Sequence, residues 1–359
     1  MHSGSDSSDT PRGLAALAPL ARAAQQVGPI ARLGARRVLG RKSPFQMTLS
    51  LTNHCNFLCD YCTIPLKRQA EMSPDQWCAL IDEFRAGGMG RVSLMGGEPL
   101  VKKGVGQIIH HLNRVGVHSA MNTNGWLVSE RMDDVTKLDL VCISLDGPEA
   151  VHDTQRRREG SYRRIIDAIE QLRRRNRPVV TMTVMTASSI GTVRHVLEVA
   201  KAMGTRAYFQ LVHDAVGDVD LPVADSVTRA QVEATMDELL HLKAEGWPVG
   251  NSAALLQQQR ANRLIGSCAE CHAGSYYGYV FCDGTVAPCV LTQKQVERGN
   301  GHARGFLRAF QELEAPQGPG CSCAPTHEVN RILNFDFGAL FEALDAALRP
   351  AALRPVADH

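Results

Sequence analysis

Three cysteines lie close together in the stretch LSLTNHCNFLCDYC, directly after an apolar run. Cys55, Cys59 and Cys62 have the spacing Cys-x3-Cys-x2-Cys. Cysteine thiolates hold iron–sulfur clusters, and a cluster of four irons with three protein ligands keeps one iron free for a substrate or cofactor. The spacing therefore predicts a reactive cluster.

A zinc site or an inert role is the alternative for these cysteines. Structural zinc is four-coordinate and usually pairs two Cys-x2-Cys halves or adds histidine, so His54 would have to be recruited. A Gly-Gly-Glu-Pro motif follows the apolar strand predicted over 91–95. Its residues are Gly96, Gly97, Glu98 and Pro99. Glycines let the backbone approach a ligand closely, although the motif on its own could be an ordinary turn.

The order of these motifs resembles the radical S-adenosylmethionine (SAM) superfamily. The resemblance implies that the methionine amino and carboxylate groups of SAM chelate the open iron, and that the Gly-Gly-Glu-Pro element holds the amino group. It also implies that Tyr61, at the aromatic position before the third cysteine, lies against adenine. The cofactors implied are a 4Fe-4S cluster and SAM.

Polar residues at the ends of two further predicted strands extend the resemblance. They are Asn122 and Asn124 at one strand end, and Ser144 and Asp146 at the next. In the family, Ser144 would be placed to bond the SAM ribose, with Asp146 beside it. The segment HDTQRRREGSY makes Arg156 an implied partner of the SAM carboxylate. A solvated surface charge is the alternative for this arginine, because two more arginines adjoin it.

Strand-like runs alternate with helical stretches over the first 211 residues. The runs are 47–52, 91–95, 118–123, 139–145, 179–184 and 206–211. Such alternation predicts an α/β fold with a parallel sheet of βα units. The resemblance makes it a partial (βα)6 TIM-type barrel with its chemistry at the carboxyl ends of the strands. The expected division is an extension over 1–44, the barrel over 45–250, a cysteine-rich domain over 251–335, and a helix and tail over 336–359.

The overall charge and hydropathy exclude some classes of protein. A net charge of +2 over 359 residues argues against nucleic-acid binding. No stretch is apolar for the roughly 20 residues that a membrane span needs, and no signal peptide is evident. An oxygen-sensitive cluster requires a reducing compartment, so the cytoplasm is expected, with flavodoxin or ferredoxin as external reductant.

The N-terminal region is rich in Ala, Leu and Arg over 13–42 and has no acidic residue between Asp9 and Asp60. An Arg-rich apolar helix can lie on an anionic membrane surface. The arginines spread over more than half of the helical wheel, however. A helix that caps the barrel, or a mobile arm, is therefore favoured over peripheral membrane contact.

Six further cysteines lie after residue 267. They are Cys268, Cys271, Cys282, Cys289, Cys321 and Cys323. Cys271 and Cys289, with Gly284 between them, resemble the Cys-x12-Gly-x4-Cys opening of SPASM and twitch domains, which implies one auxiliary 4Fe-4S cluster. A hairpin turning at Asp283-Gly284 and a helix over 299–313 are expected there.

Several ligand sets are open for this second group. The favoured set is Cys271, Cys289, Cys321 and Cys323. The final Cys-x-Cys departs from the usual Cys-x2-Cys, and Cys268, Cys271 and Cys282 could instead hold a three-cysteine cluster. A zinc ribbon is the remaining alternative. Cys78 and Cys142 fall within helical and strand patterns, so both are expected in the core.

The activity implied by the resemblance is reductive cleavage of SAM to a 5'-deoxyadenosyl radical, which abstracts hydrogen from an unactivated carbon. His213 and Asp214, at the end of the sixth strand, are candidates for the acid or base that oxidation needs, or else are loop residues. A leader-binding module of about 80 residues would not fit in the first 45. The sequence therefore favours a small-molecule or lipid-linked substrate, with a ribosomal peptide second and a non-catalytic iron–sulfur or zinc module as a different class.

Overall fold

The computed structural model describes residues 32–212, 227–262, 271–290, 299–316, 323–334, 336 and 338. Within these residues the strands form one sheet in the order β6-β5-β4-β3-β2-β1-β7-β8-β9. The strands are β1 Gln46–Ser50, β2 Arg91–Met95, β3 His118–Thr123, β4 Leu140–Ser144, β5 Val179–Met185, β6 Ala207–Leu211, β7 Tyr277–Val280, β8 Thr285–Ala287 and β9 Gly299–Asn300. All six strands predicted before residue 212 are present.

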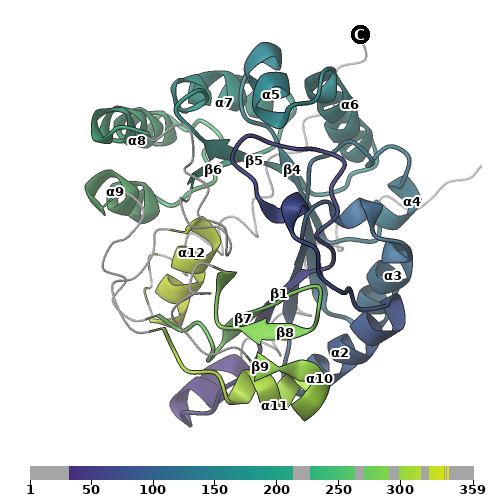
Figure 1. Ribbon diagram of the computed structural model, residues 1–359. Helices are drawn as coiled ribbons and strands as arrows, with labels where there is room; N and C mark the ends of the chain where they lie inside the picture. Colours follow the sequence, from purple (N-terminus) through teal and green to yellow (C-terminus); the bar gives the residue numbers. More distant parts are fainter. Residues whose placement is uncertain are drawn as a thin grey trace, which may run out of the picture.

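Strands β1 to β6 are parallel neighbours in chain order, as expected for βα units. The helices between and after them lie outside the curved sheet (Figure 1). They are α2 Pro74–Ala86, α3 Val105–Val115, α4 Met132–Val135, α5 Glu149–Arg156, α6 Ser161–Arg174, α7 Val193–Ala202, α8 Arg229–Ala244 and α9 Ala253–Asn262, with 3-10 turns η1 Ile64–Leu66, η2 Pro99–Val101 and η3 Ile190–Thr192. The predicted partial TIM-type barrel is confirmed.

The two faces of the sheet differ because side chains alternate along each strand. Leu94 and Met121 join Trp77 of α2 in the apolar core on the helix side. Their strand neighbours Ser93 and Asn122 point to the opposite face and are half-buried. Burying each large apolar side chain stabilises the fold by about 1.5–3 kcal/mol. The inner face thus carries half-buried polar side chains such as Ser93 and Asn122, which could contact a ligand.

The C-terminal hairpin extends the barrel sheet. Strand β7 pairs in parallel with β1, and β8 returns antiparallel to it after the turn predicted at Asp283-Gly284. Gly284 has φ of 84°, a conformation suited to glycine, and the Asp283 carboxylate accepts the Thr285 N–H at 2.9 Å. The auxiliary region is therefore continuous with the barrel wall.

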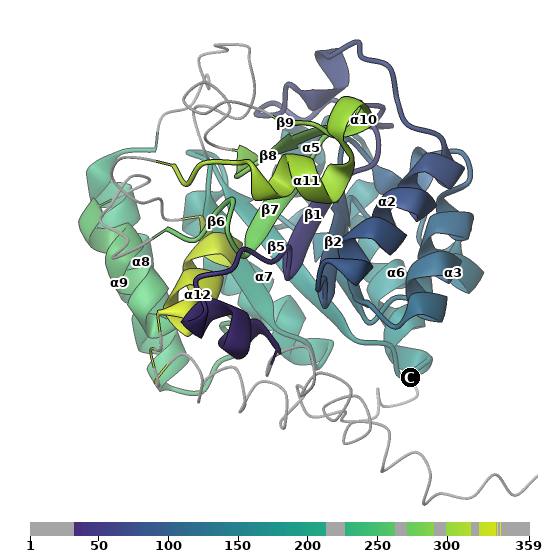
Figure 2. The same ribbon diagram turned by 90° about the horizontal axis from the view of Figure 1, so that it is seen from below.

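The single helix predicted over 299–313 is wrong. Residues 299 and 300 form β9, and two short helices follow: α10 Gly301–Arg304 and α11 Phe306–Gln311. They are separated at Gly305, whose φ of 81° and ψ of 144° lie far from helical values and are accessible mainly to glycine. A further helix, α12 Ala324–Leu333, lies between α9 and β7 in both views (Figures 1 and 2).

Residues 32–38 are helical, but most of the basic N-terminal run lies outside the described residues. No helix in the described part of the chain is long and apolar enough to cross a membrane. The less favoured alternative, contact of residues 13–42 with a membrane surface, finds no support in the described residues.

Candidate functional site

The loop with the three cysteines is held against the Gly-Gly-Glu-Pro turn. The Gly97 N–H donates to the Thr52 carbonyl at 2.7 Å, and the Glu98 N–H donates to the His54 carbonyl at 2.9 Å. A Cβ atom on Gly97 would lie 2.2 Å from the His54 oxygen, and one on Gly96 would lie 2.3 Å from the Thr52 oxygen. The glycines were expected because a ligand approaches them; the close approach that the structure shows is to the chain just before Cys55.

N–H donors surround the sulfur atoms of the triad. The Cys55 Sγ accepts the Phe57 N–H at 3.4 Å, and the Asn124 amide nitrogen lies 3.8 Å from it. The Cys59 Sγ lies 3.9 Å from Nη1 of Arg156. Such donors suit thiolate ligands, because hydrogen bonds to sulfur help to set the reduction potential of an iron–sulfur cluster. The donor set therefore fits a cluster on this loop.

Burial keeps the three thiols protonated in the absence of a metal. It raises the pKa of Cys55 to about 12 and also raises the pKa values of Cys59 and Cys62. A bound metal deprotonates a coordinating thiol outright, so cluster binding would convert these thiols to thiolates. Within the described residues no three or more His, Cys, Asp or Glu side chains are gathered closely enough to hold a metal ion.

Glu98 ties the Gly-Gly-Glu-Pro turn to the end of β3. Its side chain is 0% exposed and accepts the Asn124 N–H at 2.7 Å, the Thr123 hydroxyl at 2.8 Å and the Leu100 N–H at 3.0 Å. Burial raises its pKa to about 6, and these hydrogen bonds oppose the rise. The carboxylate is thus largely engaged by the protein, and it places Asn124 beside Cys55.

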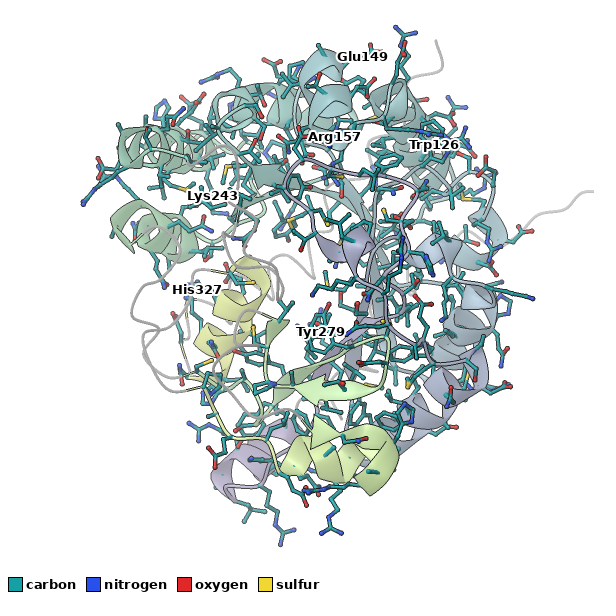
Figure 3. The ribbon with its side chains drawn as sticks, viewed as in Figure 1. Trp126, Glu149, Arg157, Lys243, Tyr279 and His327 are labelled. Carbon is teal, nitrogen blue, oxygen red and sulfur yellow. The ribbon has the colours of Figure 1, made fainter. Side chains whose placement is uncertain are left out.

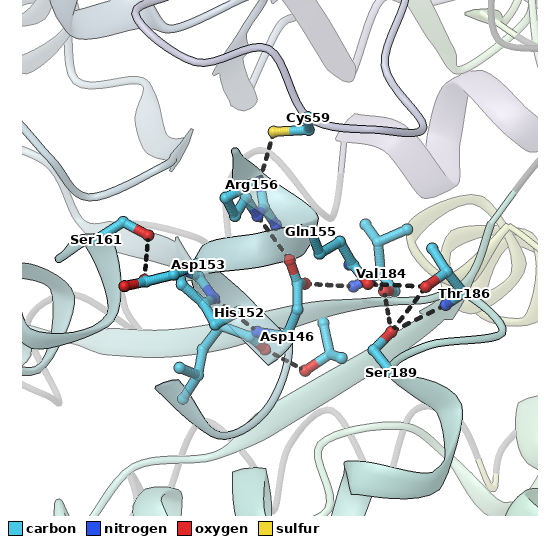
Figure 4. A network of polar contacts seen from close by, with 12 residues as sticks. Cys59, Asp146, His152, Asp153, Gln155, Arg156, Ser161, Val184, Thr186 and Ser189 are labelled. Atoms are coloured by element: carbon cyan, nitrogen blue, oxygen red, sulfur yellow. Dashed lines mark hydrogen bonds and ion pairs between the residues drawn. The ribbon is translucent and has the colours of Figure 1, made fainter. Parts of the chain in front are cut away.

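Asp146 and Arg156 form a buried ion pair at the end of β4 (Figure 4). Nε of Arg156 lies 2.6 Å from Oδ2 of Asp146, whose other oxygen accepts the Val184 N–H at 3.0 Å. The guanidinium carbon is also 5.6 Å from the ring centroid of Tyr61. Arg156 is therefore a buried residue of the site, and the surface-charge alternative is wrong. This one side chain joins β4 and β5 to the cysteine loop.

His152 accepts the Asp146 N–H through Nδ1 at 3.1 Å, and burial lowers its pKa to about 4. Because the unfolded chain binds the proton from about pH 6.5 downward, stability is fully present above pH 6.5 and is lost as pH falls toward 4, by up to about 3 kcal/mol. We expect His152→Gln, which keeps an acceptor but cannot titrate, to flatten the unfolding free energy between pH 6.5 and 4.5 in urea titrations. The exposed His241→Gln should keep the parent slope; a parent slope in His152→Gln would contradict the assignment.

The other residues predicted from the sequence lie in several places, and some of them fall outside the described residues. Asn122 donates its amide to Ser93 Oγ at 3.2 Å on the inner face, and Ser144 is the last residue of β4 on that face. Pro99 begins η2 directly after Glu98. The candidates His213, Asp214, Cys268 and Cys321 lie outside the described residues. Cys78 and Cys142, expected in the core, are both half-buried.

Sequence reasoning missed Trp126, which braces the cysteine loop (Figure 3). Arg158 and Arg164 lie over its ring, with guanidinium carbons 4.2 and 4.6 Å from the centroid. Phe57, two residues after Cys55, meets the same ring edge-on at 5.8 Å. The signal was the tryptophan directly after the Asn-Thr-Asn-Gly stretch.

A second missed residue, Tyr279, stands between the two groups of cysteines (Figure 3). Its hydroxyl bonds to Ser50, and Cys62, Cys282 and Cys289 are all near enough to influence it electrostatically. Burial raises its pKa to about 12, so it stays a neutral hydroxyl. Alternation along β7 puts Tyr277 on the same face.

The described cysteines of the second group fall into two environments. Cys271 and Cys289 pack with Tyr277 in one small cluster, where the Cys271 Sγ is 3.3 Å from the tyrosine hydroxyl. Cys282 is fully buried and lies 3.9 Å from the Gln69 oxygen in the segment that follows the triad.

The fold and the site define an iron–sulfur protein built on a partial barrel of parallel strands. Residues 49–216 match the model of the Radical SAM superfamily. This segment, a little under half of the chain, is a Radical SAM domain, and enzymes of this superfamily use a 4Fe-4S cluster and SAM.

Curated relatives align over different parts of the chain. The PqqA peptide cyclase of Rhodopseudomonas palustris is 29% identical over 167 residues, or 45% of this chain and 44% of the relative. The sporulation killing factor maturation protein SkfB of Bacillus subtilis is 28% identical over 43% and 39%. The AdoMet-dependent heme synthase of Methanosarcina barkeri is 27% identical over 76% and 83%. The chain thus spans less than half the length of the first two.

A solved structure shares the fold. Streptococcus suis SuiB bound to the precursor peptide SuiA superposes with a TM-score of 0.64 at 12% identity, over 87% of this chain and 73% of SuiB. At this identity the likeness concerns the architecture alone.

Proposed function

We propose that this chain is a radical SAM enzyme that oxidatively modifies a peptide. The observation that carries the proposal is that the cysteine loop meets two strand ends: the Asn124 amide nitrogen lies 3.8 Å from the Cys55 Sγ, and Nη1 of Arg156 lies 3.9 Å from the Cys59 Sγ. When bound, the cluster and SAM would supply a 5'-deoxyadenosyl radical able to take hydrogen from an unactivated carbon. The protein binds, orients and excludes water.

Each site residue has a task in that scheme. Cys55, Cys59 and Cys62 would hold the cluster. Nε of Arg156 donates to Asp146. Nη1 of Arg156 lies near Cys59, where it would hold the carboxylate of SAM. Tyr61, beside that guanidinium, would offer its ring to adenine.

The remaining contacts would come from the strand ends. The polar inner-face side chains of Asn122 and Ser144 would face the ribose. Backbone groups of the Gly-Gly-Glu-Pro turn would hold the amino group of SAM, with Glu98 fixing the turn through its three hydrogen bonds.

The substrate class is argued from the relatives. The small-molecule or lipid-linked substrate expected first from the sequence is less well supported than a peptide. The names of PqqA peptide cyclase and SkfB favour the peptide that was expected second. We infer that a peptide enters the polar inner face of the barrel and that Cys271 and Cys289 belong to an auxiliary cluster that takes up an electron from the substrate.

A tetrapyrrole is the second candidate substrate. The observation that favours it is the alignment with the heme synthase of Methanosarcina barkeri, which extends over 76% of this chain and 83% of the relative. That alignment includes far more of the chain than those with the two peptide-modifying relatives.

The activity is tested anaerobically with reconstituted protein, dithionite and SAM. We expect release of 5'-deoxyadenosine, and its loss in Cys59→Ala. Cys78→Ala is the matched control, because Cys78 is a half-buried cysteine of α2 that lines a separate surface groove. Equal release by the Cys59→Ala variant and the parent would overturn the enzyme assignment.

The substrate is tested by following a deuterium label. Peptides and tetrapyrroles with deuterium at unactivated carbons are supplied in parallel, and 5'-deoxyadenosine is analysed by mass spectrometry. Deuterium gained only from a peptide supports the proposal, and deuterium gained only from a tetrapyrrole transfers it to the second candidate.

A further inference from the structure

A buried histidine of α12 has no hydrogen-bond partner among the described residues. His327 of α12 is 7% exposed, and within the described residues neither of its ring nitrogens has a hydrogen-bond partner. The Asn330 amide nitrogen, one turn further on, is also buried and unsatisfied. Each buried polar group left unpaired costs about 1–3 kcal/mol. A ligand that occupies this place would remove the cost.

His327 shares one face of α12 with a cysteine and an asparagine. Residues three and four apart share a helix face, so Cys323, His327 and Asn330 form one edge at the start of α12. The Asn330 oxygen accepts the Tyr277 hydroxyl at 3.3 Å. That hydroxyl is also 3.3 Å from the Cys271 Sγ. The edge of α12 and Cys271 are therefore joined through a single tyrosine.

The composition of this region matches what a cluster ligand needs. Cys271 and Cys289 pack with Tyr277, Val329 and Leu333 in a small apolar cluster that shields the position from water. A neutral imidazole nitrogen binds iron in iron–sulfur proteins, and histidine in place of cysteine raises the reduction potential. A higher potential suits a cluster that takes up an electron from a substrate.

We propose that His327 is the fourth protein ligand of the auxiliary cluster, together with Cys271, Cys289 and Cys323. This set replaces Cys321 of the sequence-based expectation by the histidine one turn beyond Cys323. The proposal rests on the auxiliary cluster of the proposed function.

The test isolates the auxiliary cluster. Cys55, Cys59 and Cys62 are changed to Ala together, and the protein is reconstituted anaerobically, reduced with dithionite and examined by pulsed electron paramagnetic resonance. We expect about four irons per chain and a nitrogen-14 coupling to the reduced cluster. Growth with nitrogen-15 histidine should convert it to a nitrogen-15 coupling.

Variants of His327 then assign the nitrogen. His327→Cys should retain the iron, lose the nitrogen coupling and lower the midpoint potential; His327→Ala should lose both coupling and iron. His302→Ala is the control, because His302 is an exposed histidine of α10 and should leave all readings unchanged. Circular dichroism checks that each variant is folded.

The outcomes distinguish failure of the His327 assignment from failure of the proposed function on which it rests. An iron-loaded triple variant without histidine coupling overturns the ligand assignment and leaves the auxiliary cluster standing. A triple variant that binds no iron, or binds zinc instead, overturns the auxiliary cluster and the role of His327 with it. Release of 5'-deoxyadenosine by the parent is measured independently of both.

Discussion

Arg156→Leu is expected to lower the free energy of unfolding by about 3–5 kcal/mol, because it leaves the Asp146 carboxylate charged, buried and without its partner. Asp146 is 0% exposed, so water cannot replace the guanidinium. The same change removes the donor near Cys59. We therefore expect weaker SAM binding as well as lower stability, measured by anaerobic urea denaturation and equilibrium dialysis with labelled SAM.

Two companion variants separate the buried ion pair from general effects of the change. Arg157→Leu removes the neighbouring arginine, whose pair with Asp60 is solvent-exposed on both sides, so a loss of at most about 1 kcal/mol is expected. The double change Asp146→Asn with Arg156→Leu removes both charges and should recover part of the stability. Equal losses in the Arg156 and Arg157 variants would contradict the role assigned to the buried pair.

Gly97→Ala is expected to cost about 1–3 kcal/mol, the range for forcing extra atoms into a well-packed site. The added Cβ would stand 2.2 Å from the His54 carbonyl oxygen. This oxygen belongs to the backbone next to Cys55, so the cysteine loop must move to relieve the clash. We expect reconstituted Gly97→Ala to bind markedly less iron than the parent.

Gly191→Ala is the control for this substitution. Nothing lies within 4 Å of a Cβ placed on Gly191, so its iron content and urea midpoint should match those of the parent. Iron binding by Gly97→Ala at the parent level would show that the turn does not position Cys55.

The strands and the cysteine triad could be predicted from the sequence because their signals are local. Apolar runs of strand length bounded by turns identified β1 to β6. The spacing of Cys55, Cys59 and Cys62 predicted a cluster with three protein ligands. The break at Gly305 could not be predicted with the same ease, because glycine is tolerated within a helical pattern at modest cost.

The roles of single residues in the site depended on contacts between distant segments. Arg156 and Arg157 are adjacent in sequence and chemically identical, yet one is buried against Asp146 and the other is exposed. In the sequence Trp126 is an isolated aromatic residue. Only the structure shows that Phe57 and two arginines contact its ring. Sequence neighbours could not distinguish these cases.

The sequence by itself indicated a parallel sheet of βα units and a three-cysteine motif, since periodicity and spacing are properties of short segments, and the family resemblance implied the barrel and the cluster. Only the tertiary structure decided what supports that site: Glu98 as a buried hub, Asp146 with Arg156 as a buried pair, and glycines packed on the cysteine loop. The physical reason is that desolvation, and the partners that offset it, depend on which segments the fold brings together. His327 stands out for the same reason, because only the fold shows that it is buried without a hydrogen-bond partner among the described residues.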